Sequence, residues 1–150
     1  MADAAPQKFE HYDAQLAEKL IAANAAATGL PKYLGIELVE YGPGRLVAEM
    51  AVRDELKNPF GMIHGGVVAG LVDHVLGMVA YPLMRRGQWA ATTEFKLNYL
   101  SAVSGGTLRA DTQVVSMTRT TMIVRIDVTN EGRLACIAQG TVLIRDPKPA

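Results

Sequence analysis

The sequence has one cysteine, no excess of either charge and no segment resembling a signal peptide, and each absence narrows what the protein can be. Lysine plus arginine number 15, and aspartate plus glutamate also number 15, so no overall field attracts a nucleic acid or another polyanion. The single Cys136 excludes an internal disulfide, and the run MADAAPQKFEHYDAQLAEKL is too polar for a secretory signal. We therefore expect a reduced, cytoplasmic protein that does not bind nucleic acid.

Signatures of several enzyme classes and of a membrane span are also missing. No Gly-x-Ser-x-Gly motif is present, so a serine triad of the α/β-hydrolase type is not expected. His64, Asp73 and His74 lack the i, i+4 spacing of helical metal ligands, and we predict no metal. Asp73 and His74 also interrupt the apolar run 67–84, which indicates a buried helix and no membrane span.

A length of 150 residues suits one domain with a single core, and no repeat or low-complexity linker divides the chain. Near the N-terminus, apolar residues at three- and four-residue spacing predict an amphipathic helix that ends at Thr28-Gly29, with Pro31 beyond it. These apolar residues are Phe9, Tyr12, Leu16, Leu20 and Ala23. We therefore expect an N-terminal helical extension, residues 1–30, and a main domain, residues 31–150.

Six strand-like runs and one long apolar helix are predicted for the main domain. The runs cover residues 33–42, 45–52, 89–100, 107–117, 122–130 and 133–144, and the helix covers residues 65–84. In the fifth run, apolar residues alternate with Arg125 and Asp127, so one face of that strand should be buried. Two strands, a central helix and four antiparallel strands predict an α+β domain whose sheet curls around the helix.

The run NPFGMIHGGVVAGLVD, residues 58–73, contains the residues with the clearest chemical potential. The N-terminus of a helix has unpaired N–H groups and about half a positive charge, and a glycine there lets a ligand carbonyl reach the backbone. Gly65 is thus a candidate donor to the oxyanion of an acyl-transfer reaction, where one donor is worth roughly 3–4 kcal/mol. The alternative is that Gly65 and Gly66 only allow close packing.

Asp73 is a carboxylate in an otherwise apolar helix. Burying a charge costs several kcal/mol unless the charge is paired or hydrated, so Asp73 needs a compensating partner or a role. One interpretation makes it a general base. The other makes it a surface-facing or salt-bridged residue.

Asn58, the His64-Gly65-Gly66 run and Asp73, followed by ATTEFKLNYL, a Gly-rich turn and a closing AQGT strand, resemble the hotdog-fold acyl-CoA thioesterases. The resemblance is to the phenylacetate-pathway, or PaaI-like, branch and runs from about residue 34 to residue 144. It implies a hotdog fold, in which an antiparallel sheet wraps around a long central helix, here with an extra N-terminal helix. It also implies that the Asn58 amide and the Gly65 amide bind the thioester carbonyl, and that Asp73 is the base or nucleophile.

Four more residues are candidates for supporting roles, two of them through the resemblance. Thr92 aligns with a hydroxyl residue that positions the attacking water, although Thr93 is a competing choice and either could be an ordinary strand threonine. His64 belongs to the catalytic set, where it would fix the loop by a local hydrogen bond or act as a base. Gly66 and Arg119 would contact the substrate, Arg119 through the phosphates of CoA. CoA is then part of the substrate, and no cofactor is expected.

Further candidates are less specific. Other basic residues that could meet the CoA phosphates are Arg85, Arg86, Lys96 and Arg133. Apolar residues near the motif that could line an acyl pocket are Phe60, Met62, Met78, Tyr81 and Trp89. Each of these has a simpler interpretation, as a solvated surface charge or as a core residue.

Helix geometry adds a requirement for two subunits. Gly65 and Asp73 are eight residues apart, hence roughly 12 Å along one helix axis, and cannot both reach one carbonyl. Two antiparallel copies of the helix, related by a twofold axis near Ala69, would set Gly65 of one subunit against Asp73 of the other. The small residues that permit this approach are Gly66, Ala69, Gly70 and Gly77. We therefore expect a homodimer with shared active sites, which could pair further into a dimer of dimers.

The expected activity is hydrolysis of an aryl- or medium-chain acyl-CoA to the free acid and CoA. An enoyl-CoA hydratase of the same fold is an alternative, but Asp73 and His74 point about 100° apart around the helix. A non-catalytic acyl-CoA binding or sensing module is the other alternative, and the presence of Asp73 argues against it.

Overall fold

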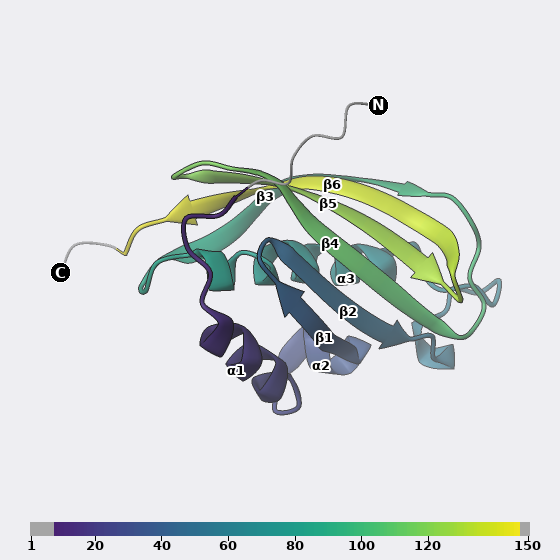
Figure 1. Cartoon of the computed structure of the whole chain (residues 1–150). Coiled ribbons are helices and arrows are strands. Elements are labelled where there is room, and N and C mark those ends of the chain that lie inside the picture. The colour runs from purple at the N-terminus through teal and green to yellow at the C-terminus, as the bar shows by residue number, and fades with distance from the viewer. Residues whose placement is uncertain (1–7, 148–150) are drawn as a thin grey trace.

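One helix, α3 (Gly65–Met78), lies inside a curved antiparallel sheet in the computed structural model, which describes residues 8–147 (Figure 1). The strands are β1 (Ile36–Gly42), β2 (Arg45–Ala51), β3 (Trp89–Tyr99), β4 (Thr107–Met117), β5 (Thr121–Asn130) and β6 (Arg133–Arg145). Their order across the sheet is β1-β2-β4-β5-β6-β3, so β1 and β3 form its two edges. This arrangement confirms the predicted α+β class and the sheet wrapped around the helix.

The strand pattern places one face of the sheet against α3. The alternating apolar residues of β5 are fully buried, and Arg125 and Asp127 face outward and pair with each other at 3.0 Å. On α3, the residues that face the sheet are buried, whereas Gly66 and Asp73 are exposed. The residues of α3 that enter the core are Val68, Leu71, Val72, Val75 and Leu76. The core therefore fills the space between one helix face and the concave side of the sheet.

The helix begins at the predicted residue but ends earlier than predicted. Regular α-helix ends at Met78, and a single 3-10 turn, η2 (Tyr81–Leu83), follows it. Pro82 explains the difference, because its ring would clash with the carbonyl four residues before it and it has no N–H to donate. Within residues 8–147, the stretch Gly65–Leu83 is long and apolar enough to cross a membrane by length and composition alone, and half of its apolar window is buried inside the protein. A buried core helix has the same length and composition.

The N-terminal helix is shorter than predicted. Helix α1 (Ala14–Asn24) starts after Asp13, whose carboxylate accepts a hydrogen bond from the Leu16 N–H at 2.9 Å. Phe9 and Tyr12 precede this N-cap and pack against the core from a non-helical segment. A capping aspartate satisfies a first-turn N–H only at the helix end, so the helix begins there.

A second short helix, which the sequence did not predict, overlaps the first two residues of the predicted strand 33–42. Helix α2 (Gly29–Leu34) has Pro31 in its first turn, where the missing N–H of proline costs nothing. It ends at Gly35, whose φ of 73° lies in the left-handed region. Residues 33 and 34 therefore belong to a helix, and the first strand starts at Ile36. The expected division between residues 30 and 31 falls inside α2.

Gly140 of β6 lies where α3, β3 and β6 come together. A Cβ there would be 2.8 Å from the Glu94 carbonyl oxygen, 2.8 Å from the Phe95 Cβ and 2.9 Å from the Leu76 Cδ1. We expect Gly140→Ala to lower the free energy of unfolding by about 1–3 kcal/mol, because backbone must move to accept the methyl group. Gly105→Ala is the matched control, since open space surrounds that position. Urea unfolding of both variants measures the difference, and equal stabilities would contradict this account of the packing.

Candidate active site

His64 caps the N-terminus of α3. Its backbone is extended, and its Nδ1 accepts a hydrogen bond from the Gly66 N–H at 2.9 Å. Its own N–H donates to the Leu56 carbonyl at 2.9 Å, next to the 3-10 turn η1 (Asp54–Leu56). His64 therefore makes the local hydrogen bond considered for it, and this bond fixes the entry into the helix.

The His64–Gly65 and Gly65–Gly66 peptide bonds contain four polar groups, two carbonyls and two N–H groups. The His64 carbonyl accepts from the Val67 N–H at 2.9 Å, and the Gly65 carbonyl accepts from the Tyr99 hydroxyl at 2.7 Å. The Gly66 N–H donates to His64, so three of the four polar groups have partners. The fourth, the Gly65 N–H, donates to no group within residues 8–147. The structure thus leaves one backbone donor free at a helix N-terminus, where an anion or a polarised carbonyl is favoured.

Asn58 forms a tight turn before α3. Its side-chain oxygen accepts hydrogen bonds from the Phe60 N–H at 2.9 Å and the Met62 N–H at 3.2 Å. These bonds use the oxygen and orient the amide, so the side-chain NH₂ group, which bonds to no acceptor in the described part of the chain, is the end left for a ligand. Asn58 can therefore fill both roles considered from the sequence, as a turn residue and as a residue that binds a carbonyl.

A cavity of about 410 Å³ lies beside these groups. Its lining includes Asn58, Met62, Gly65 and Tyr99, together with apolar residues from α3, from strand ends and from the segment after β3. Those apolar residues are Val68, Leu100, Val103, Leu108, Val128, Ala135 and Cys136. Two hydrogen-bond donors at an apolar cavity suit a ligand with one carbonyl group and an apolar tail.

Of the apolar residues considered for an acyl pocket, one lines this cavity and the others lie elsewhere. Met62 lines the cavity, but Phe60 is 86% exposed and Trp89 is 49% exposed. Met78 and Tyr81 pack against the core near the other end of α3. Proximity along the chain suggested these residues, whereas the walls come from strands that are distant in sequence.

Tyr99 and Cys136 are cavity residues that the sequence did not single out for the site. They are paired neighbours on β3 and β6. Burial raises the pKa of the Cys136 thiol to about 11, so it is a neutral core residue and no nucleophile at ordinary pH. Burial also raises the pKa of Tyr99, which keeps its hydroxyl protonated and able to donate to Gly65. The available signal was strand alternation, which places Tyr99 on the same face of β3 as Phe95 and Leu97, although Tyr99 itself is 56% exposed.

Asp73 lies away from this cavity. It is exposed on the outer face of α3 and has no salt bridge or hydrogen bond to the described residues of its own chain. The expected cost of burying it therefore does not arise within one subunit. His74 beside it is largely buried, and this burial lowers the pKa of His74 despite the neighbouring carboxylate.

Thr92 and Thr93 differ in their surroundings. Thr93 lies at a bulge of β3, and its hydroxyl donates to the Thr141 carbonyl at 3.1 Å. Thr92 is half-buried and makes no such bond within residues 8–147. Of the two, Thr92 is therefore the threonine with a hydroxyl available to a ligand or water.

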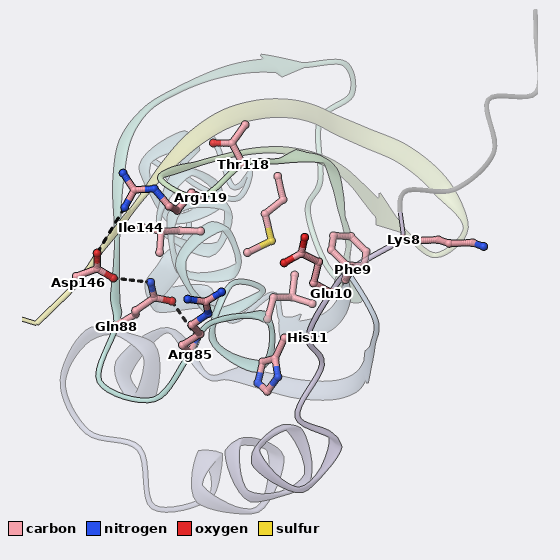
Figure 2. A pocket seen from close by; sticks show the side chains of 12 residues that line it. Lys8, Phe9, Glu10, His11, Arg85, Gln88, Thr118, Arg119, Ile144 and Asp146 are labelled. Atoms are coloured by element: carbon pink, nitrogen blue, oxygen red, sulfur yellow. Dashed lines mark hydrogen bonds and ion pairs between the residues drawn. The ribbon is translucent and has the colours of Figure 1, made fainter.

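Arg119 lines a second cavity, also of about 410 Å³, beyond the C-terminal end of α3 (Figure 2). It pairs with Asp146 at 3.7 Å, and Asp146 also accepts a hydrogen bond from Gln88. Arg85 lines the same cavity, and its guanidinium has no partner among the described residues. The carboxylate of Glu10 also faces this space. The structure thus brings together two of the arginines considered for CoA and separates them from Gly65 by the length of α3.

Within residues 8–147, no group of three or more His, Cys, Asp or Glu side chains is placed to hold a metal ion.

Comparison with known families identifies the fold group. Residues 60–137 match the model of the thioesterase superfamily, a stretch that includes the His64-Gly65-Gly66 run and Asp73. The chain belongs to this superfamily. It is 34% identical to the proofreading thioesterase EntH of Cronobacter turicensis, over 80% of this chain and 89% of that protein. It is 32% identical to human acyl-coenzyme A thioesterase 13, over 84% and 91%, and 27% identical to the 1,4-dihydroxy-2-naphthoyl-CoA hydrolase of Listeria monocytogenes, over 78% and 96%.

Solved structures confirm the hotdog fold. A thioesterase from Haemophilus influenzae superposes with a TM-score of 0.81 at 23% identity, covering 88% of this chain and 92% of that one. A phenylacetic acid degradation-related protein from Ralstonia eutropha gives a TM-score of 0.77 at 21% identity, covering 84% and 97%. The hotdog thioesterase resemblance of the sequence is confirmed, and the reaction class is thioester hydrolysis. The roles of individual site residues stay predictions.

The capping role of His64 predicts different effects for two substitutions. His64→Ala removes the cap and should lower the free energy of unfolding by about 1 kcal/mol, with a loss of thioesterase activity as the Gly66 peptide loosens. His64→Asn places another good N-cap residue there and should retain stability and most of kcat. Thermal unfolding and steady-state kinetics measure both effects. If His64→Asn were stable but as inactive as His64→Ala, His64 would take part in the chemistry itself.

Proposed function

We propose that the protein hydrolyses aryl- or medium-chain acyl-CoA thioesters to the free acid and CoA. The observation that carries the proposal is the Gly65 N–H at the N-terminus of α3, which donates to no group within residues 8–147 and lies next to the side chain of Asn58 and an apolar cavity. Membership of the thioesterase superfamily supports the reaction class. The name of the Listeria relative, a 1,4-dihydroxy-2-naphthoyl-CoA hydrolase, supports an aryl acyl group.

The thioester carbonyl would accept hydrogen bonds from the Gly65 N–H and the Asn58 amide. Negative charge develops on this oxygen in the transition state, so the donors stabilise the transition state more than the substrate. A water molecule attacks the carbonyl carbon and gives its proton to Asp73, or the Asp73 carboxylate attacks first and water hydrolyses the resulting anhydride. In the first route the C–S bond breaks after water has added, and in the second it breaks as the anhydride forms. In both routes CoA leaves as a thiolate that takes up the proton released from water.

The Asp73 that serves each site would come from the partner subunit. Within one chain, Asp73 is eight residues from Gly65, roughly 12 Å along the axis of α3. It lies among small residues on the outer face of α3, and at Gly77 no described atom outside the helix's own nearby backbone lies within 4 Å of the position that a Cβ would take. Two copies of this stripe packed antiparallel would bring the partner's Asp73 to the free Gly65 N–H. Thr92, half-buried on β3, would position the water from the same subunit as that Asp73.

The cavity of Figure 2 would take the phosphate end of CoA. In the antiparallel dimer, the C-terminal end of the partner's α3 approaches Gly65, so the partner's second cavity lies on the side from which CoA would leave the thioester. Arg85 and Arg119 supply two positive charges there, and Arg85 has no competing partner in the described part of the chain. Guanidinium groups suit phosphate oxygens in charge and geometry.

The proposed function is tested by thiol release from a panel of aryl- and alkyl-CoA thioesters. We expect turnover by the wild type, with Asp73→Asn lowering kcat by about 10²–10⁴-fold and changing KM only modestly. The reason is that Asp73 acts in the chemical step and carries little of the binding energy. Retention of kcat within about tenfold would remove Asp73 from the mechanism. Binding of several thioesters without turnover by the wild type would favour an acyl-CoA sensor.

Mixed dimers test the sharing of the site. Asn58→Ala and Asp73→Asn homodimers should both be crippled, but a mixed dimer has one site with both lesions and one site with neither. Random reassortment of equal amounts makes about half of the dimers mixed, so the unfractionated mixture should recover roughly a quarter of wild-type activity and purified mixed dimers roughly half. The variants are co-expressed with different tags, because a large interface exchanges slowly. Purified mixed dimers with no recovery would contradict the antiparallel arrangement of α3.

If Arg85 and Arg119 bind the phosphates of CoA, removing both side chains should weaken substrate binding. The Arg85→Ala and Arg119→Ala double variant should raise KM for an acyl-CoA by about fivefold to tenfold at unchanged kcat, because the phosphates contribute binding away from the carbonyl. The corresponding pantetheine thioester, which lacks the nucleotide, should show no such change. Arg125→Ala is the control, since it removes an exposed guanidinium that pairs with Asp127 elsewhere on the sheet. Equal effects on both substrates would remove the arginines from phosphate binding.

A further inference from the structure

We propose that Tyr99 is a positioning residue that aims the Gly65 N–H at the thioester carbonyl. The proposal rests on the proposed function and adds a residue from β3 to the groups at the start of α3. Tyr99 lines the same cavity as Asn58 and Gly65, and its hydroxyl donates to the Gly65 carbonyl at 2.7 Å. The hydroxyl therefore binds the carbonyl of Gly65 and leaves the N–H of Gly65 free for a ligand.

The hydroxyl of Tyr99 makes one of two hydrogen bonds that restrain the peptide between Gly65 and Gly66. Two adjacent glycines have no Cβ to restrict the backbone, so the peptide between Gly65 and Gly66 could rotate at a helix end. The His64 Nδ1 holds the N–H of this peptide at 2.9 Å, and the Tyr99 hydroxyl holds its carbonyl at 2.7 Å. Holding both edges of the peptide sets the direction of the neighbouring Gly65 N–H. An oxyanion donor must point at the oxygen before the reaction begins to be fully effective.

The ring of Tyr99 limits the space above Gly65. A Cβ on Gly65 would be 2.9 Å from the Tyr99 Oη and 3.1 Å from the Tyr99 Cζ. The ring and the glycine backbone are thus in close contact, which explains why the first helical residue has no side chain. The ring also forms the wall of the cavity next to the donor, so a bound acyl group would lie against it.

The position of Tyr99 is itself fixed by the sheet. Tyr99 is the last residue of β3 and pairs with Cys136 of β6. Directly after it, the Leu100 and Ser101 N–H groups both donate to the Ala135 carbonyl, at 2.9 and 3.2 Å. The strand end therefore transmits the geometry of the sheet to the helix N-terminus. A burial-raised pKa keeps the Tyr99 hydroxyl a donor at neutral pH.

Tyr99→Phe keeps the ring and removes the hydroxyl. We expect kcat to fall about tenfold, KM to change less than about threefold and the melting temperature to change little. Two non-hydrolysable CoA analogues report on the donor directly. Binding of a ketone, which keeps the carbonyl and replaces sulfur by CH₂, should weaken about tenfold, and binding of a thioether without a carbonyl should weaken less than about twofold. In the free protein, hydrogen exchange of the Gly66 amide should become faster, because its peptide has lost one of two restraints.

Tyr41→Phe is the matched control. It removes a tyrosine hydroxyl that donates to the Met78 carbonyl at 3.0 Å, at the other end of the same helix. Its kcat and its ratio of ketone to thioether affinity should stay within about twofold of wild type. If the wild type hydrolyses thioesters but Tyr99→Phe is equally active, or weakens both analogues alike, Tyr99 is a wall residue only and the proposal is wrong. A wild type without turnover or preference for the ketone would instead overturn the proposed function, and the role of Tyr99 with it.

Discussion

An α-helix cannot satisfy the N–H groups of its own first turn, and the proposed chemistry of this protein depends on how that constraint is met at α3. His64 accepts from Gly66, and the described residues leave the Gly65 N–H without an acceptor. The same helix is packed inside the curved sheet, so its N-terminus cannot shift to find another partner (Figure 1). A donor that is held in place and left unsatisfied is costly for a folded chain but useful for binding a carbonyl that becomes negative.

The two ends of α3 carry different parts of the proposed site. Near the N-terminal end lie the free amide, Asn58 and an apolar cavity, and beyond the C-terminal end lies a cavity with two arginines. Asp73 lies between them, exposed and unpaired on the described part of its own chain. Within one subunit, Asp73 is roughly 12 Å along the helix from Gly65, too far for both to reach the same carbonyl as the proposed mechanism requires. The small residues along the outer face of α3 offer a way to bring two subunits together, because they let helix backbones approach closely.

Local patterns in the sequence predicted much of the fold. Period-two alternation identified the strands, and the Gly65-Gly66 pair located the start of α3, because these signals act within a few residues. The errors were also local. A capping aspartate shortened α1, a short helix with Pro31 in its first turn took the first two residues of an expected strand, and Pro82 ended α3 early. In each case the general periodicity was outweighed by the chemistry of one residue at an element's end.

The amino-acid sequence alone was enough to indicate the order of the elements, their buried faces and the donor at Gly65, because each depends on neighbours within one or two helical turns. Which groups meet across the fold was decided by tertiary structure. Tyr99 reaches Gly65 across 34 residues, the cavity walls come from the ends of β4, β5 and β6, and Arg85 and Arg119 meet in one cavity. These contacts follow from strand register, such as the pairing of Tyr99 with Cys136, and register is set by the whole sheet closing around α3.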